Sequence, residues 1–298
     1  MLVRGYAREE ELLLGQVVFL NGEFVPKERA LIHISDRGFQ LGDGIYEVVR
    51  CYRGRAFRLS EHIERLLQSA DAIRLQLPYN RDELTEGVKT LLGDVSWEYA
   101  NVYVQVTRGP AARVHKFPSA VQPTVLMYVY QSKPVSRALR EAGIAAIIVP
   151  DTRGTLCHIK SVNLLPCVLA KQAAADAGVE EAFFERQGIG VVEGASSNIF
   201  AVLEGVLHTS PISPYILPGV TRDCVLQLAE SQGMPVELRF MSREELANAS
   251  EVFITSTSKE VLAVTHIAGD VIGSGRPGPV CLKLATDYSR LVEQECGI

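Results

Sequence analysis

The chain has 298 residues, of which 47% are hydrophobic and 22% charged, and its formal net charge is -5. These values are typical of a folded globular protein of about two domains, and they exclude disordered and collagen-like chains. The sequence contains no basic block with interspersed aromatic residues, no apolar run of about 18 residues and no signal-peptide core near its start. We therefore expect no nucleic-acid partner, no membrane partner and a cytoplasmic location.

The first part of the chain alternates predicted strands and helices. The segment "QVVFLNGEFV" predicts two strands joined by a type I′ turn at Asn21 and Gly22, and "GIYEVVRCYRGRAFRLS" repeats that pattern around Gly54. A helix with Ser60 as its N-cap follows, and a second helix spans residues 81–92. The strands "NVYVQVTRG" and "TVLMYVY" complete this part.

The polar segment "QSKPVS" is the predicted linker. Beyond it, "GIAAIIVP" and "EVFITSTS" are typical of buried strands, and "TRDCVLQLAESQG" predicts a helix capped by Thr221. Another helix begins at Ser242, which forms a capping box with Glu245. The fold class is therefore mixed α/β (α+β). We expect a small N-terminal domain over residues 1–131, including an extension over 1–14, a linker over 132–137 and a larger domain over 138–298.

The six cysteines show no C-x-x-C pair and no histidine at the spacing of a zinc site. We interpret them as reduced core thiols and expect no metal site.

Lys160 is the first candidate for chemistry, because it comes just before the apolar run "NLLPCVLA", which we interpret as the inner face of a helix. A lysine at a helix entrance can extend its amine to water, which is the simpler interpretation. The alternative is an amine kept reactive by desolvation, which lowers its pKa.

Glu193 ends an apolar strand in "GIGVVEGASSNIF" and is followed by small residues. The simpler interpretation is a carboxylate in a polar turn. A pyridoxal phosphate enzyme, however, needs an acid opposite the pyridine nitrogen, and small neighbours let the backbone approach a flat ring.

Three further segments could bind a phosphate. In "YILPGVTRD" a glycine and Thr221 open a helix whose free N–H groups suit an anion. Thr257 could add a hydroxyl at a strand end, and Arg65 could add charge, although Glu61 four residues earlier also explains Arg65 as a surface ion pair.

Two segments could bind a carboxylate. "VTRGPAARVHKFP" places Arg113 and His115 in a loop after a strand, and Tyr46 in "GDGIYEVV" could add its hydroxyl. The alternatives are a solvated basic loop and an ordinary strand aromatic.

Taken in order, "DRGFQLGDGIYEVVR", "EHIERL", "VTRGPAARVHKFP", "IKSVNLL", "EGASSNIF", "LPGVTRD" and "TSTS" resemble the fold-type IV pyridoxal phosphate enzymes. The resemblance is greatest to the bacterial D-amino acid aminotransferases and runs from about Gly15 to the last helix. It implies a smaller N-terminal α/β domain, a larger C-terminal domain with a barrel-like sheet, and pyridoxal 5'-phosphate between them.

The resemblance also implies the roles of individual residues. Lys160 matches the lysine that forms the Schiff base with the cofactor and moves the substrate proton, and Glu193 matches the partner of the pyridine nitrogen. The phosphate-binding positions are matched by Arg65, Val220, Thr221, Ser256 and Thr257. Ser196 matches a serine of the cofactor's hydrogen-bond network, and Leu217 matches a leucine against the ring.

Tyr46, Arg113 and His115 match the carboxylate-binding residues of the D-amino acid enzymes, in which the arginine and histidine come from the partner subunit. A homodimer is implied in this way. Two departures stand out: Ala195 occupies a position where serine is common, and the first fourteen residues have no counterpart.

The predicted function is transamination between a D-amino acid, such as D-alanine, and a 2-oxo acid, such as 2-oxoglutarate. A branched-chain L-amino acid aminotransferase and an aminodeoxychorismate lyase share the fold and stay open as alternatives. A binding protein without catalysis is disfavoured because it would need neither Lys160 nor Glu193.

Overall fold

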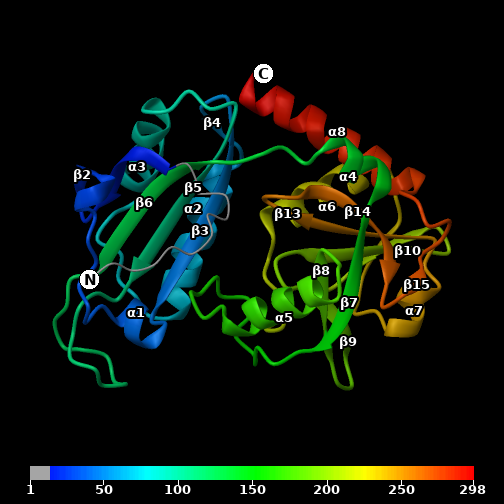
Figure 1. The fold of residues 1–298 in the computed structure, drawn as a ribbon, viewed down its shortest axis with the longest axis horizontal. Helices are drawn as coiled ribbons and strands as arrows, with labels where there is room; N and C mark the ends of the chain where they lie inside the picture. The colour runs from blue at the N-terminus through cyan, green and yellow to red at the C-terminus, as the bar shows by residue number, and fades with distance from the viewer. Residues whose placement is uncertain (1–13) are drawn as a thin grey trace.

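The computed structural model describes residues 14–298, so the predicted extension lies outside the described residues except for Leu14. The first half of the chain forms a six-stranded antiparallel sheet in the order β2-β1-β6-β5-β3-β4 (Figure 1). Its strands are β1 (Leu14–Leu20), β2 (Glu23–Pro26), β3 (Gly44–Tyr52), β4 (Arg55–Ala56), β5 (Tyr99–Thr107) and β6 (Thr124–Gln131).

Both predicted hairpins are confirmed. The β1–β2 turn has positive φ at Asn21 and at Gly22 (52° and 99°), and the β3–β4 turn has positive φ at Arg53 and at Gly54 (46° and 78°). Positive φ at both central residues is the mark of the type I′ turn, whose twist matches that of the strands.

Helices α2 (Leu59–Ala72) and α3 (Arg81–Gly93) cover one face of this sheet. Ile63 and Leu66 pack there against the Val102, Val104 and Val106 face of β5, and all five are fully buried.

The prediction that Ser60 caps α2 is wrong. Arg58, in the left-handed region with φ of 53°, precedes the helix, and its carbonyl accepts the N–H of His62 at 3.1 Å. The first turn is therefore closed from Arg58 without the hydroxyl of Ser60. Two short helices, η1 (Lys27–Arg29) and α1 (Arg37–Leu41), lie between β2 and β3.

The second half forms a curled nine-stranded mixed sheet, which confirms the mixed fold class (Figure 1). The strand order is β12-β11-β10-β13-β14-β7-β8-β9, and β15 pairs with β14. The strands are β7 (Ile144–Pro150), β8 (Glu181–Arg186), β9 (Gly190–Gly194), β10 (Asn198–Leu203), β11 (Val206–Thr209), β12 (Val236–Leu238), β13 (Glu251–Ser256), β14 (Glu260–Ile267) and β15 (Asp270–Val271).

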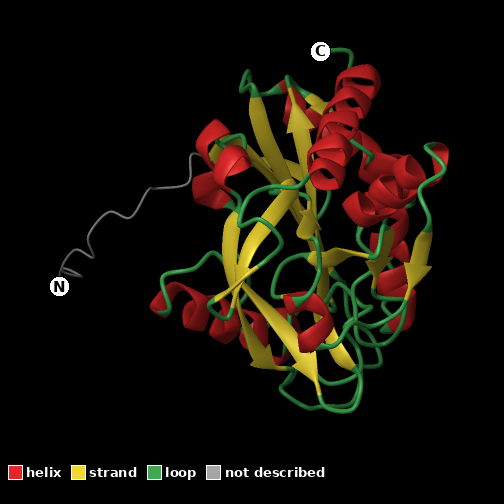
Figure 2. Cartoon of the chain, turned by 90° about the vertical axis from the view of Figure 1, so that its right-hand side faces the viewer, coloured by secondary structure: helices red, strands yellow, loops and turns green. Residues whose placement is uncertain are grey.

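The helices of this half lie around the strands, as Figure 2 shows. They are α4 (Arg137–Ala142), α5 (Leu165–Asp176), α6 (Val220–Ser231), α7 (Arg243–Ala247) and α8 (Pro279–Cys296). The core between α6, α8 and the sheet also takes in Tyr52 and Phe57 from the first half, and the Tyr52 hydroxyl donates to Glu260 at 2.9 Å. The two halves thus share a packed contact.

Two details of these helices differ from prediction and one agrees. The N-cap of α6 is Gly219, so Thr221 lies inside the first turn, whereas Ser242 and Glu245 do form the capping box of α7. The apolar run of α5 points outward: Leu165 and Val168 are 67% and 59% exposed. Helix α5 packs on β8 through small alanines, which allow close approach, and this leaves the large side chains outside.

Four of the cysteines are buried, while Cys157 and Cys167 are half-buried, so only the four belong fully to the core. Within residues 14–298, no helix combines the length and the apolar character needed to cross a membrane.

Candidate active site

Lys160 lies in the segment between β7 and α5, where the backbone is held against β3. The amide of Tyr46 donates to the Lys160 carbonyl at 2.9 Å, and the Lys160 Nζ lies 4.4 Å from the centroid of the Tyr46 ring. Part of Lys160 remains exposed, yet burial, followed by the positive charge of Arg65, lowers its pKa to about 8. A larger share of the amine is therefore neutral near pH 7 to 8 than in an ordinary lysine, and the neutral form is the nucleophile.

This shift gives a prediction for the protein without cofactor. Because the folded-state pKa of Lys160 lies below its unfolded value of about 10.4, the amine opposes folding below pH 8, and its effect disappears as the pH rises through roughly 10.4. Lys160→Met should thus stabilise the apoprotein at pH 7 and lose that advantage by about pH 10.5, as measured by urea unfolding. An advantage independent of pH would contradict the prediction.

Arg65 is a buried residue of α2 and does not pair with Glu61. Its Nε and Nη2 donate to both carboxylate oxygens of Glu47 at 2.7 and 2.9 Å, while Glu61 pairs with Arg58. The surface-pair interpretation is therefore wrong. His62 Nδ1 also contacts Glu47 at 2.8 Å, and although burial favours the neutral acid, Arg65 and His62 hold the pKa of Glu47 well below its ordinary value.

Arg65 also reaches the start of α6. Its Nη1 donates to the Pro218 carbonyl at 2.9 Å, directly before the N-cap Gly219, which forms no side-chain cap. The N–H groups of Val220 and Thr221 in the first turn are therefore available to an anion beside the guanidinium.

The end of β13 approaches the same place. Thr255 faces Asn198 across the strand pair, and the Asn198 amide donates to the Leu217 carbonyl at 2.9 Å. The Thr255 hydroxyl is buried and has no hydrogen-bond partner among the described residues. Ser256 and Thr257 follow, both half-buried, with the Ser256 hydroxyl accepting the Lys259 N–H at 3.1 Å.

Glu193 is buried near the end of β9, and both of its carboxylate oxygens have partners. Its Oε2 accepts the Leu217 N–H at 3.0 Å and the Asn198 amide at 3.1 Å, and its Oε1 forms an ion pair with Arg153. Burial raises the pKa of Glu193 to about 7, opposed chiefly by Arg153. Arg153 is itself held by Asp151 and lies with its guanidinium 4.1 Å from the Phe184 ring centroid.

Ser196 is more peripheral. Its hydroxyl donates to the buried Glu181 at 3.2 Å, and Ser197 donates to the same carboxylate at 3.0 Å. Ala195 is buried in this turn.

Arg113 and His115 lie in the loop between β5 and β6, and both side chains are exposed. The loop projects from the foot of the six-stranded sheet, on the side away from the nine-stranded sheet (Figure 1). The structure thus gathers Lys160, Tyr46 and the α6 segment around one place and leaves these two residues outside it.

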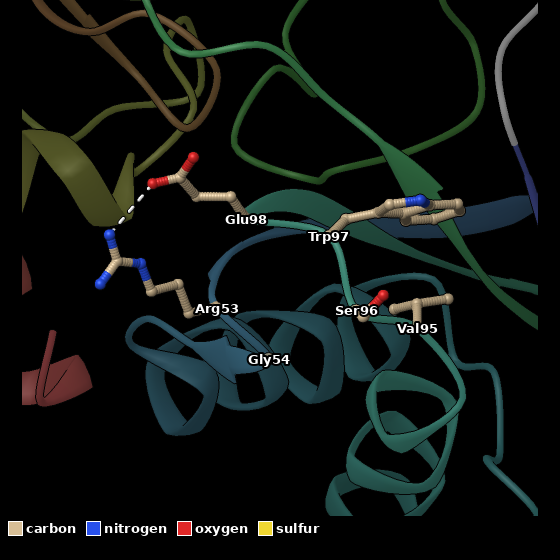
Figure 3. A pocket seen from close by; sticks show the side chains of 6 residues that line it. All are labelled: Arg53, Gly54, Val95, Ser96, Trp97 and Glu98. Carbon is tan, nitrogen blue, oxygen red and sulfur yellow. Dashed lines mark hydrogen bonds and ion pairs between the residues drawn. The ribbon is translucent and has the colours of Figure 1, made fainter.

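A pocket elsewhere contains none of the predicted site residues. Figure 3 shows it at the β3–β4 turn, where the exposed Arg53 and Glu98 form an ion pair at 3.2 Å. It is lined by Arg53, Gly54, Val95, Ser96, Trp97 and Glu98. Such a solvent-facing pair contributes little energy and presents no reactive group.

Comparisons with known proteins identify the family of the chain. Residues 44–267 match the family model described as amino-transferase class IV. The chain belongs to the class IV aminotransferases. It is 42% identical over 280 residues to a D-alanine aminotransferase of Bacillus licheniformis, covering 93% of this chain and 98% of that one. It is 40% identical over 276 residues to one from Staphylococcus haemolyticus, with the same coverage.

Solved structures give the same fold. A branched-chain amino acid aminotransferase of Escherichia coli has a TM-score of 0.88 at 28% identity, covering 93% of this chain and 94% of that one. A second branched-chain enzyme, solved with pyridoxamine 5'-phosphate, has a TM-score of 0.88 at 28% identity and covers 94% and 95%. Class IV aminotransferases use pyridoxal phosphate, so this chain is a pyridoxal phosphate-dependent enzyme.

The residues present fit that cofactor. Such an aminotransferase needs an amine to hold the cofactor's aldehyde, an acid beside the pyridine nitrogen and an anion-binding site for the phosphate. Lys160 has a depressed pKa, Glu193 is a buried acid, and Arg65 reaches the segment before α6. The buried Thr255 hydroxyl near the end of β13 has no hydrogen-bond partner within residues 14–298. A Cβ on Gly219 would lie 2.0 Å from the Asn198 Oδ1, so only glycine lets the α6 start approach so closely.

Our sequence analysis missed Glu47, Arg153 and Thr255. Glu47 had one available signal, since it lies between Ile45 and Val49 on the inward face of β3, where an apolar residue is expected. The partners of Arg153 and Thr255 are distant in sequence, and no local pattern indicates them.

Proposed function

We propose that this chain transfers the amino group of a D-amino acid, such as D-alanine, to a 2-oxo acid, such as 2-oxoglutarate. The observation that carries the proposal is the greater identity of the chain to D-alanine aminotransferases, 40–42%, than to the structurally similar branched-chain enzymes, 28%. The loop with Arg113 and His115 supports it, because two cationic donors suit a carboxylate.

When bound, pyridoxal phosphate supplies an aldehyde that accepts the amino group and a ring that withdraws electrons from the substrate. Lys160 is the amine that would hold the cofactor and, once the substrate amine has displaced it, would accept the proton from the substrate Cα. Its depressed pKa supports both tasks, because a neutral amine is required to take up a proton near neutral pH.

Glu193 would face the pyridine nitrogen. Its carboxylate is oriented by the Leu217 N–H and by Asn198, which leaves it little freedom to turn away. A fixed anion there favours a protonated ring nitrogen. Ser196 and Leu217 would complete the contacts around the ring.

The phosphate would bind at the α6 start. Arg65 supplies the positive charge and has one Nη1 N–H left beyond its contacts with Glu47 and Pro218. Val220 and Thr221 add backbone N–H groups, and Ser256 and Thr257 add hydroxyls at the end of β13.

The substrate carboxylate would be bound by Tyr46 together with Arg113 and His115 of a partner subunit. Burial raises the pKa of Tyr46 to about 12, so its phenol stays protonated and can donate. A homodimer is supported by α5, whose Leu165, Val168 and Leu169 are 67%, 59% and 61% exposed. Such apolar patches are typical of interfaces.

The homodimer can be tested with mixed subunits. We expect Lys160→Ala subunits and Arg113→Gln/His115→Gln subunits, each impaired alone, to form a mixed dimer with one intact site of near-parental KM. Two different affinity tags isolate that dimer. A mixed dimer with the KM of the loop variant would contradict the shared site.

The decisive experiment adds D-alanine and, separately, L-leucine to the purified holoenzyme and follows the visible absorbance of the bound cofactor. Loss of the band with D-alanine alone supports the proposal. Loss with L-leucine alone favours the branched-chain activity, which the solved structures suggest as the second candidate. No change with either points to the lyase.

The domain division and the cellular location also belong to the proposal. The domain division at residues 132–137 is supported by the end of β6 at Gln131 and the start of α4 at Arg137. A cytoplasmic location is supported by six free cysteines, which are typical of a reducing compartment.

A further inference from the structure

The loop between β5 and β6 (residues 108–123) is held by a set of buried charged groups that the chemistry does not use. Arg37, at the start of α1, is 2% exposed. Its Nη1 donates to the Val114 carbonyl at 2.6 Å and its Nη2 donates to the His115 carbonyl at 3.3 Å. One guanidinium therefore fixes the backbone between the two residues proposed to bind the substrate carboxylate.

Arg37 is itself held in place. Its Nε donates to Asp43 at 2.8 Å, and the same carboxylate oxygen accepts Nε of Arg108 at 2.8 Å. Burial alone would raise the pKa of Asp43, but the hydrogen bonds from Arg108 and Arg37 lower it, so the carboxylate stays charged. Arg108 lies at the first position of the loop, with its guanidinium 3.7 Å from the ring centroid of Phe117.

Both ends of the loop are tied to the residue before Arg37. Asp36 Oδ2 accepts the hydroxyls of Thr107 and Thr124 at 2.9 and 2.7 Å, which are the last residue of β5 and the first of β6. Gly109 is in the left-handed region with φ of 89°, and a Cβ there would lie 1.9 Å from the Gln122 carbonyl oxygen. The loop therefore begins from a rigid, closely packed base.

The tip of the loop is different, since Arg113 and His115 are exposed. A loop of this length samples several conformations unless its backbone is bound. Figure 1 shows α1 beside the base of the loop. The two Arg37 hydrogen bonds join α1 to the segment between the proposed carboxylate-binding residues.

We propose that Arg37, oriented by Asp43, is a positioning residue for substrate binding: it holds the 108–123 loop in the conformation in which Arg113 and His115 bind the substrate carboxylate. This inference rests on the proposed function. If the loop adopts the binding conformation in only a fraction of the molecules, the apparent substrate affinity falls in proportion to that fraction. The chemical steps are unchanged once substrate is bound.

The test compares Arg37→Gln with the parental holoenzyme, using whichever amino acid the parental enzyme converts. We expect KM for the amino acid and for the 2-oxo acid to rise together by roughly tenfold or more, with kcat within about threefold, because two charged hydrogen bonds are lost. The dissociation constant of pyridoxal phosphate should stay within about twofold, since its proposed contacts lie elsewhere. Arg37→Lys should restore part of the KM.

A double-mutant cycle separates positioning from a general structural defect. In an Arg113→Gln/His115→Gln background, Arg37→Gln should change KM by less than about twofold, because its effect passes through those side chains. A full effect in that background, or a loss of cofactor affinity equal to the rise in KM, would overturn the proposal. Unchanged KM values in Arg37→Gln would also overturn it.

Two controls complete the design. Arg137→Gln removes an exposed arginine, ion-paired with Glu141, and should leave KM unchanged. If Arg37→Gln does not fold, Asp43→Asn replaces it, because loss of this carboxylate frees Arg37 to turn; parental KM values in that variant would overturn the proposal. The choice of amino acid by the parental enzyme tests the proposed function separately, so the two failures are distinguishable.

Discussion

Lys160→Ala is expected to lower the turnover of D-alanine with 2-oxoglutarate by about 10⁴-fold or more, because the residue that moves the substrate proton is removed. The Lys160 amine lies 4.4 Å from the Tyr46 ring centroid, and burial lowers its pKa to about 8. Steady-state turnover of the purified variant measures the effect. Cofactor should still bind through the α6 start, and ultrafiltration measures that binding.

A matched control is Lys283→Ala. Lys283 is exposed on α8 and pairs with Asp287 at 3.0 Å, so its loss removes a lysine and an ion pair without touching the site. Its turnover should equal that of the parent. Turnover of Lys160→Ala at the parental rate would contradict the assignment of Lys160 as the residue that moves the substrate proton.

Glu193→Gln should lower kcat by about 10²- to 10³-fold, while the enzyme still binds pyridoxal phosphate. The amide can keep the hydrogen bond from the Leu217 N–H, so the shape of the site is preserved. What is lost is the negative charge that favours a protonated pyridine nitrogen. Burial raises the pKa of Glu193 to about 7, and pairing with Arg153 opposes this rise, so the charge depends on that partner.

The control for this variant is Glu185→Gln on the neighbouring strand β8. Glu185 pairs with Arg243 at 2.7 Å near the surface, away from the proposed ring contacts. Its kcat should stay at the parental value. Equal kcat values for Glu193→Gln and the parent would show that the carboxylate is not needed, and the pyridine role would pass to another residue.

The elements that sequence predicted well are those decided by neighbours in the chain. The Asn21–Gly22 turn follows from the φ values that these two residues tolerate, and the Ser242–Glu245 capping box follows from side chains three residues apart. The alternation of Val102, Val104 and Val106 marks the buried face of β5. In each case the interaction lies within one turn or one strand.

The wrong predictions concern helix positions that depend on packing against other segments of the chain. Thr221 has a side chain typical of a cap, but the N-cap of α6 is Gly219, where a Cβ would lie 2.0 Å from the Asn198 Oδ1. The large apolar residues of α5 are predicted to face the core, but the buried residues of this helix are Ala170 and Ala174. Neither constraint is visible in the local sequence.

The sequence by itself determined the hairpins, most helices, the family resemblance and the identity of Lys160 and Glu193 as candidates, because these depend on local conformation and on ordered motifs. Only the tertiary structure decided that Arg65 pairs with Glu47, that Arg153 forms an ion pair with Glu193, and that Arg37 binds a loop 77 residues away. Those contacts join segments far apart in the chain, and the low-dielectric interior that strengthens them exists only once the sheets have formed.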